Sequence, residues 1–183
     1  KVLLGRCTGI SFVDSTPQRV CKNQRIHIHK VFKGIAQRGK CSMGWFFGFK
    51  LHLICNEKGE LLNFMITPGD IDDRKPLEYK AFIDFIYGKL FGDKGYIGKN
   101  IFQRLFVDGI QLITKLKSNR KGALMSVSDR LLLRKRAIIE TANDELKNIA
   151  QVEHSRHRCF DNFIVNLFGA IAAYCLFPKK PCI

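Results

Sequence analysis

Two aspartates, Asp14 and Asp93, each stand at the end of a strand-like run in a basic chain. Asp14 ends GISFVD, residues 9–14, and Asp93 ends residues 88–93. The first fifty residues contain ten lysines and arginines but a single acid, Asp14. Because carboxylates held together repel one another unless a cation neutralises them, two strand-end acids in this setting indicate a cation site. The alternative for Asp14 is an ordinary turn residue before Ser-Thr-Pro.

A third carboxylate lies in the helical segment RKRAIIETANDELKN, residues 134–148. Successive helical residues advance by about 100°, so Arg136, Glu140 and Lys147 share a narrow sector. The apolar stripe lies on the opposite side and comprises Ile138, Ala142, Leu146 and Ile149. One interpretation is a solvated face with an Arg–Glu pair one turn apart. The other is a carboxylate presented beside two cations that could hold phosphate groups.

Other acids compete for the same role. Asp70, Asp72 and Asp73 crowd into the segment DIDDRKP. Acids and Asx turns are favoured at the start of a helix, and we interpret these three that way. Asp144 shares much of the helical face of Glu140 and ranks second to it as a metal ligand.

The cysteines and histidines do not follow a zinc-binding pattern. The seven cysteines are far apart with no C-x-x-C pair, which is typical of reduced thiols in an intracellular protein. Four histidines lie among arginines and lysines, where we expect contact with phosphate or solvent: His27, His29, His154 and His157. Four aromatic residues could stack on bases but, in a strand, are more often core: Trp45, Phe46, Phe47 and Phe49.

The net charge of the chain indicates which class of molecule it binds. The chain has 183 residues, 46% of them hydrophobic, which suffices for one domain with a sizeable core. Its 31 lysines and arginines exceed its 16 acids, which gives a formal charge of +15. This excess favours a polyanion, and we expect nucleic acid and no membrane. The longest apolar stretch, residues 163–177, has the length of a buried helix and is too short to span a bilayer.

Strands and helices alternate in the pattern of an α/β domain with a mixed sheet. Strands are predicted over residues 9–14, 45–57, 60–69, 88–93 and 110–117, with 45–57 and 60–69 forming a hairpin. Helices are predicted after Pro76, over 100–108 from a cap at Asn100 to Gly109, over 129–150 and over 161–176. The helix after Pro76 has an apolar stripe of Leu77, Ala81, Phe82 and Phe85. The basic segment 15–43 is predicted to be a loop with at most a short helix.

Several segments in a fixed order give the chain a family resemblance. They are FVDSTPQRVC, HKVFKGIAQRGK, GWFFGFKLHLICNEKGELLNF, TPGDIDDRKP, GDKGYIGK, ITKLKSN, LLLRKRAIIETANDELKNI and VEHSRHR. Over roughly residues 9–183, the chain resembles bacterial insertion-sequence transposases of the DDE class, most closely those of insertion-sequence family 982. The resemblance implies an RNase H-like fold, with a central mixed five-stranded sheet flanked by helices. We therefore expect residues 1–183 to form one catalytic domain, without the N-terminal DNA-binding region that related transposases carry.

The resemblance also implies the roles of the acids. Carried over by motif, Asp14, Asp93 and Glu140 are the catalytic acids and the ligands of Mg²⁺ or Mn²⁺, two ions in all, with Asp14 bridging both. The Tyr-Arg-Glu-Lys signature of the wider class fits Arg136, Glu140 and Lys147, but Leu133 stands at the tyrosine position. We expect the DNA backbone to be held by basic side chains near these acids. They are Arg136, Lys147, Lys94, Lys50, Lys115 and Lys117.

The implied activity is DNA strand cleavage and strand transfer by in-line phosphoryl transfer, which moves an insertion sequence. The expected partners are double-stranded DNA, as transposon ends and target, and further copies of the chain in a homodimer or higher oligomer. We expect the protein in the bacterial cytoplasm, associated with the nucleoid. The alternatives are a nuclease of the same fold and an inactive remnant that only binds DNA. A basic protein of ribosomal or chromatin type is a third, although it would not need lone acids at strand ends.

Overall fold

The computed structural model describes residues 3–115, 125–153 and 157–183. One sheet is built from β1 (Ile10–Cys21), β2 (Gln37–Cys41), β3 (Gly44–Asn56), β4 (Leu61–Pro68), β5 (Gly88–Gly92) and β6 (Ile110–Thr114). The strand order is β2-β3-β1-β5-β6, and β4 also pairs with β3. β1, β5 and β6 run parallel, whereas β3 is antiparallel to β1, β2 and β4. The predicted mixed sheet and the predicted hairpin are therefore confirmed.

Two strands, β2 and then β4, pair with the same edge of β3. Its first residues, from Gly44 to Gly48, pair with β2, and the residues from Phe49 to Cys55 pair with β4. Its other edge pairs with β1. Where β2 gives way to β4 the backbones approach so closely that a Cβ on Gly39 would lie 2.1 Å from the carbonyl oxygen of Gly69. This junction therefore requires glycine.

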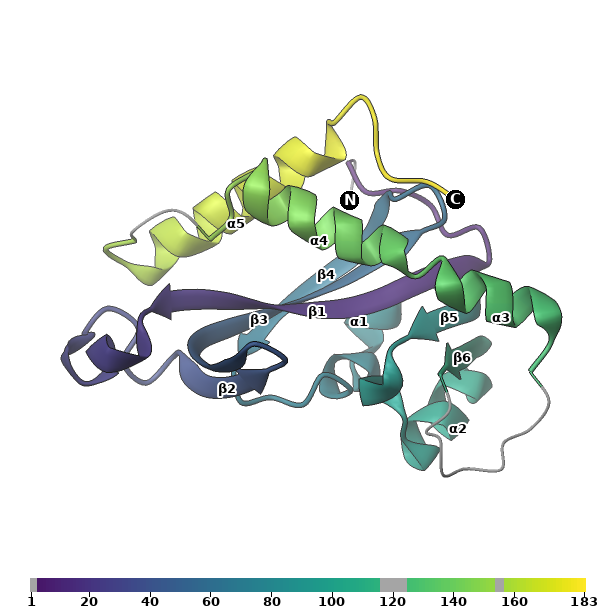
Figure 1. The fold of residues 1–183 in the computed structure, drawn as a ribbon, viewed down its shortest axis with the longest axis horizontal. Coiled ribbons are helices and arrows are strands. Elements are labelled where there is room, and N and C mark those ends of the chain that lie inside the picture. Colours follow the sequence, from purple (N-terminus) through teal and green to yellow (C-terminus); the bar gives the residue numbers. More distant parts are fainter. Residues whose placement is uncertain (1–2, 116–124, 154–156) are drawn as a thin grey trace.

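Helices cover both faces of the sheet (Figure 1). One layer contains α3 (Val127–Arg134), α4 (Ala137–Asn148) and α5 (Phe160–Cys175), and the other contains α1 (Lys80–Ile83) and α2 (Lys99–Val107). Three short 3₁₀ turns are η1 (Asn23–Ile28), η2 (Lys75–Glu78) and η3 (Lys94–Tyr96). Among the described residues, no helix has the length and apolar character needed to cross a membrane.

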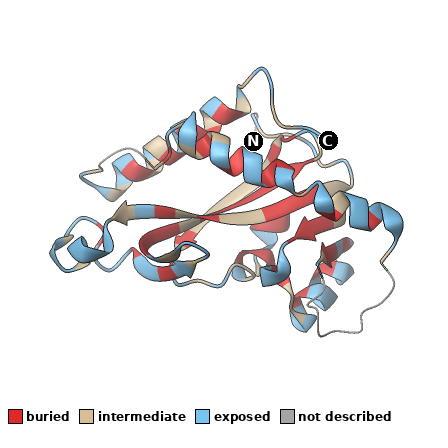
Figure 2. Cartoon of the chain, in the orientation of Figure 1, coloured by how far each residue is buried: buried red, intermediate tan, exposed pale blue. Residues whose placement is uncertain are grey.

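The alternation of side chains along β1 explains the two layers. Phe12 and Val13 are adjacent and fully buried. Phe12 packs in the cluster beneath α4 and α5, whereas Val13 packs with α1 and α2, because successive strand side chains point to opposite faces. A third, aromatic cluster contains Phe32, Phe47, Phe49 and Phe163. Figure 2 shows the buried residues along the sheet and on the inner faces of the helices.

Two strand predictions are wrong. β1 does not end at Asp14 but continues through Pro17 to Cys21. It pairs with β5 only over Ile10–Phe12, so its later residues leave one edge open, where a proline is tolerated. β2 lies within the segment 15–43 that was predicted to be a loop, and it raises the number of described strands from the predicted five to six.

The helix predictions also need correction. The segment 129–150 forms two helices, α3 and α4, separated at Lys135 and Arg136. At this break the N–H groups of Ile138 and Ile139 bond to carbonyls three residues back, a tighter geometry than that of an α-helix. The predicted cap of α2 at Asn100 is wrong, because Gly98 occupies the capping position.

The helix predicted after Pro76 is a 3₁₀ turn followed by the single turn α1. Leu77 and Phe82 of its predicted apolar stripe are buried, but Ala81 and Phe85 are exposed. Phe85 has a φ of 66°, which lies in the left-handed region and carries the chain out of the helix.

Candidate active site

Parallel pairing brings Asp14 and Asp93 to corresponding positions on neighbouring strands. Phe12 of β1 lies beside Phe91 of β5, and each aspartate is two residues further along its chain. The rings of Phe12 and Phe91 stack on the sheet face that α4 covers, with centroids 5.6 Å apart. Since side chains two residues apart in a strand share a face, both aspartates are directed toward this side of the sheet. The strands that lead to the two aspartates are thus neighbours in the sheet, as a cation site shared by both acids requires.

Asp14 is the most enclosed of the three acids. One oxygen, Oδ2, accepts a hydrogen bond of 3.1 Å from Nδ2 of Asn143 on α4. The other, Oδ1, lies 3.9 Å from Nη1 of Arg136. Burial raises the pKa of Asp14 to about 6, and the charges of Glu140 and Asp93 add to the rise, whereas Arg136 and the N–H of Ser15 oppose it. The negative charges of Glu140 and Asp93 therefore both disfavour ionisation of Asp14.

Arg136 joins two of the carboxylates. Its Nη2 donates a hydrogen bond to Oε1 of Glu140, one helical turn away, while Nη1 faces Asp14. The Arg136 side chain is 14% exposed and that of Glu140 is 52% exposed. Arg136 stands at the break between α3 and α4, so this break directs its guanidinium toward β1. It supplies the positive charge that a cluster of acids needs.

Asp93 and Glu140 are exposed, unlike Asp14. Asp93 directly follows β5, and its carbonyl accepts the hydrogen bond from the Tyr96 N–H that begins η3. No group of three His, Cys, Asp or Glu side chains in the described part of the chain is gathered closely enough to hold one metal ion. In the arrangement described, Glu140 is held by Arg136 and not by the other two acids.

The predicted DNA-contacting lysines differ in their availability. Lys94 and Lys115 are exposed. Lys50 is engaged elsewhere, because its Nζ lies 2.9 Å from Oδ1 of Asp73 and donates to the carbonyl of Ile71 at 2.7 Å. Lys147 faces Glu153, with 3.7 Å between Nζ and Oε1. The remaining predicted contact, Lys117, lies outside the described residues.

The other acids occupy structural positions. Asp72 accepts hydrogen bonds from the backbone and the guanidinium of Arg74, and this bonding lowers the pKa of Asp72 to about 2. Asp73 pairs with Lys50. These contacts fit the predicted turn before a helical segment. Asp144, the second choice as a metal ligand, is exposed on α4.

Only one of the four aromatic candidates is available to a ligand. Phe46, Phe47 and Phe49 are buried, as the core interpretation predicted. Trp45 is 55% exposed. The guanidinium carbon of Arg38 and Nζ of Lys40 lie 5.7 and 5.9 Å from the centroid of its ring.

Asn143 is a site residue that the sequence interpretation missed. It is buried on α4 beside Asp14, and its Oδ1 has no hydrogen-bond partner in the described structure. The signal was present, because an amide stands within the buried stripe Ile139, Ala142, Asn143 and Leu146. A polar residue at such a position needs a partner, and here that partner is a carboxylate.

Two comparisons with known proteins identify the family and the fold. A family model described as a transposase DDE domain matches residues 4–160. The fold is similar to that of a piggyBac transposase, solved by cryo-electron microscopy as a synaptic complex with hairpin DNA. The TM-score is 0.57 at 9% sequence identity, and the match covers 92% of this chain and 46% of the piggyBac chain. The present chain thus spans less than half of that protein. No curated protein sequence matches it.

Proposed function

Because the chain belongs to the transposase DDE domain family, we propose that it cleaves DNA strands and joins them to new sites by in-line phosphoryl transfer. The observation that carries this proposal is the placement of the three acids: Arg136 faces both Asp14 and Glu140, and Asp93 directly follows β5, the strand that pairs with β1. In a chain with a formal charge of +15, a local concentration of carboxylates works against DNA binding. Such a concentration is explained if the acids serve the chemistry of a phosphodiester.

The donor set fits a hard divalent cation. Carboxylate oxygens are the ligands that Mg²⁺ and Mn²⁺ prefer. The unpartnered Oδ1 of Asn143 adds a buried acceptor beside Asp14, where water bound to an ion could donate. In the proposal, Asp14, Asp93 and Glu140 would hold Mg²⁺ or Mn²⁺, as two ions. Bound ions of this kind activate the attacking oxygen and stabilise the leaving oxygen.

The residues of the chain itself supply charge and orientation. Asn143 fixes the carboxylate plane of Asp14 through its hydrogen bond to Oδ2. Arg136 neutralises Asp14 and Glu140 before the acids bind a cation, and it then has a planar fork free to hold a phosphate oxygen. Lys94, Lys115 and Lys147 add positive charge for the DNA backbone.

The remaining parts of the proposal concern partners and setting. Double-stranded DNA, as transposon ends and target, is the proposed substrate, and the DNA complex of the piggyBac transposase supports it by analogy. We further propose a homodimer or higher oligomer at work in the bacterial cytoplasm. The order of the sequence motifs favours insertion-sequence family 982.

The test is nicking of supercoiled DNA in the presence of Mg²⁺ or Mn²⁺. Asp93→Asn is expected to abolish nicking while DNA affinity stays equal or rises slightly, because a repulsive charge is removed. Asp108→Asn, at an exposed aspartate after α2, is the matched control and should nick normally. Wild-type nicking by Asp93→Asn would refute the proposal.

Two further measurements resolve the alternatives. Nicking without transfer of pre-cleaved ends would favour a nuclease of the same fold. Comparison of Glu140→Gln with Asp144→Asn tests the third ligand, because only the first is expected to lose activity.

A further inference from the structure

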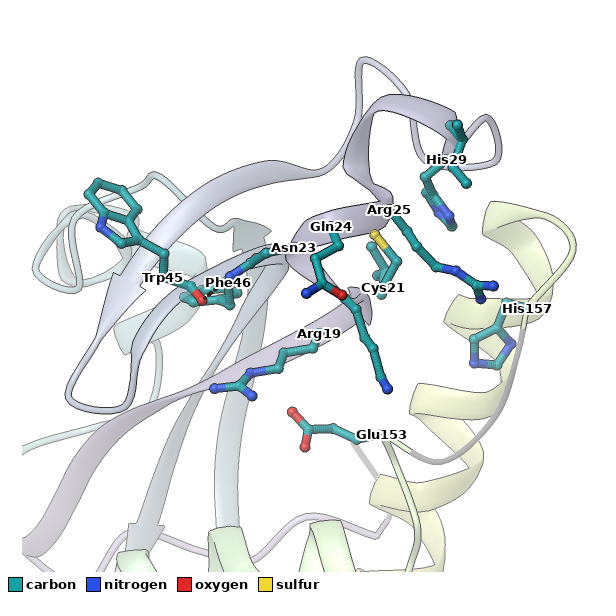
Figure 3. A pocket seen from close by; sticks show the side chains of 13 residues that line it. Arg19, Cys21, Asn23, Gln24, Arg25, His29, Trp45, Phe46, Glu153 and His157 are labelled. Carbon is teal, nitrogen blue, oxygen red and sulfur yellow. Dashed lines mark hydrogen bonds between the residues drawn. The ribbon is translucent and has the colours of Figure 1, made fainter.

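A second basic site lies beyond the carboxylates, at the far end of β1. It is a groove of about 1040 Å³ between the end of β1, η1, the start of β3 and the segment after α4. Arg19, Arg25 and Glu153 reach into the groove from three of these elements (Figure 3). Its volume is at the upper end of the range for small-molecule pockets, so a short stretch of nucleotides can enter.

The charged residues that line this groove favour an anionic ligand. Arg19, Lys22 and Arg25 line it and are exposed. Glu153 is the one acidic residue among the described residues that line the groove. Its Oε1 lies 3.7 Å from Nζ of Lys147, so its charge is already paired. The lining is therefore cationic overall, as a phosphate backbone requires.

Trp45 gives the rim of the groove an exposed aromatic ring. Its indole is directed outward in Figure 3, and its carbonyl accepts a 2.8 Å hydrogen bond from Nδ2 of Asn23, which ties β3 to η1. Arg38 and Lys40 lie over the ring, so a nucleotide stacked there would have cations near its phosphate. Aromatic rings in basic grooves stack on bases of unpaired nucleic acid, because bases within a duplex already stack on one another.

The groove and the carboxylates share the same elements. Arg19 follows Asp14 by five residues on β1, which is about 17 Å of extended chain, a distance that a few nucleotides of an unpaired strand can span. On α4, Lys147 lies on the same face as Glu140 and contacts Glu153 at the groove. A strand that passes the carboxylates can thus continue into the groove.

We propose that this groove binds an unpaired DNA segment a few nucleotides from the carboxylates and that Trp45 stacks on one of its bases. The identification of the nucleic acid as DNA rests on the proposed function. The groove, the cations and the exposed indole are independent of it.

Trp45 is the sole tryptophan of the chain, so its fluorescence reports directly on this site. The experiment titrates the protein, in EDTA, with a twelve-nucleotide oligo-dT and with a duplex of the same length. Oligo-dT is expected to quench the indole emission. Trp45→Ala should weaken oligo-dT binding, followed by anisotropy of a labelled strand, by roughly 5- to 150-fold, the range for one stacked base. Duplex affinity should change less than twofold.

Control variants separate stacking from charge and from folding. Trp45→Phe keeps an aromatic ring and should retain most of the affinity for oligo-dT. Phe106→Ala removes another exposed aromatic side chain, on α2, and should leave oligo-dT binding unchanged. Arg19→Gln should lower the salt dependence of oligo-dT binding by about 0.7 units in log–log slope, the value for one contact to a single strand.

Three results would overturn the proposal: no quenching by oligo-dT, unchanged oligo-dT affinity of Trp45→Ala, or tighter binding of oligo-U than of oligo-dT. Failure of the proposed function has a different signature. In that case wild-type protein lacks metal-dependent nicking, while quenching by oligo-dT persists.

Discussion

Protonation of His52, a fully buried histidine on β3, is expected to oppose folding at acidic pH. Its Nε2 lies 2.9 Å from Oγ1 of Thr67, and its ring packs edge-on against Phe82. Burial lowers the pKa of His52 from 6.5 to about 4; the nearby charge of Asp73 opposes this shift and that of Lys50 adds to it. Folding therefore requires the neutral imidazole at this position.

The sign and size of the effect follow from proton linkage. Between pH 6.5 and pH 4 the unfolded chain binds a proton at His52 that the folded chain excludes, so the contribution of His52 to the free energy of unfolding falls as the pH falls. Integration between these two pKa values gives a loss of about 3 kcal/mol from pH 7 to pH 4. This is a large fraction of the stability of an ordinary domain.

The assay is urea denaturation followed by far-ultraviolet circular dichroism at pH 7, 6, 5 and 4. His52→Gln has no titrating group at this position, so its stability should decline less between pH 7 and pH 4, by about 3 kcal/mol. Thr67→Val is the control, because it removes the hydrogen-bond partner but leaves His52 buried and the pH dependence in place. Parallel pH profiles for wild type and His52→Gln would refute the reasoning.

Two predictions concern the charges around the candidate active site. Arg136→Gln should raise the pKa of Asp14 further above about 6, because Arg136 is the nearest opposing charge; carboxyl NMR titration measures this, and an unchanged value would contradict it. Lys147→Ala should reduce the log–log salt slope of duplex binding by about 0.9 units. An unaltered slope would mean that Lys147 pairs with Glu153 and does not contact a phosphate group.

The parts of the fold that could be predicted have a local periodic signal. Residues 45–57 and 60–69 are two mainly apolar runs separated by a Lys-Gly turn, and they form β3 and β4. Two apolar runs that each lead to an acid singled out Asp14 and Asp93, and the family resemblance placed them together; β1 and β5 do pair in parallel. Glu140 stands on a helix opposite a clear apolar stripe, of which Ile138, Ala142 and Leu146 are buried.

The parts that could not be predicted depend on tertiary partners. β2 has the polar sequence QRGKC and forms a strand because β3 offers it a free edge. The second half of β1 contains Pro17 and is extended by pairing with β3. Lys50 pairs with Asp73, which lies 23 residues later and gives no signal in a local window. The hydrogen bond from Asn143 to Asp14 joins residues 129 positions apart.

Because β2 and β4 pair with different parts of one edge of β3, β2 can separate from β3 without disturbing β4. β2 pairs only with the first five residues of β3, where β4 is not yet attached. Separation of β2 from β3 breaks the hydrogen bonds between these two strands and the hydrogen bond from Asn23 to the carbonyl of Trp45. The pairing of β3 with β4 remains intact. Amide hydrogens of β2 should then exchange with solvent by local opening, at a lower free energy than those of the central ladder. Local opening of β2 would accordingly uncover the edge of β3 beside Trp45, while the pairing of β1 with β3 and β5 stays intact.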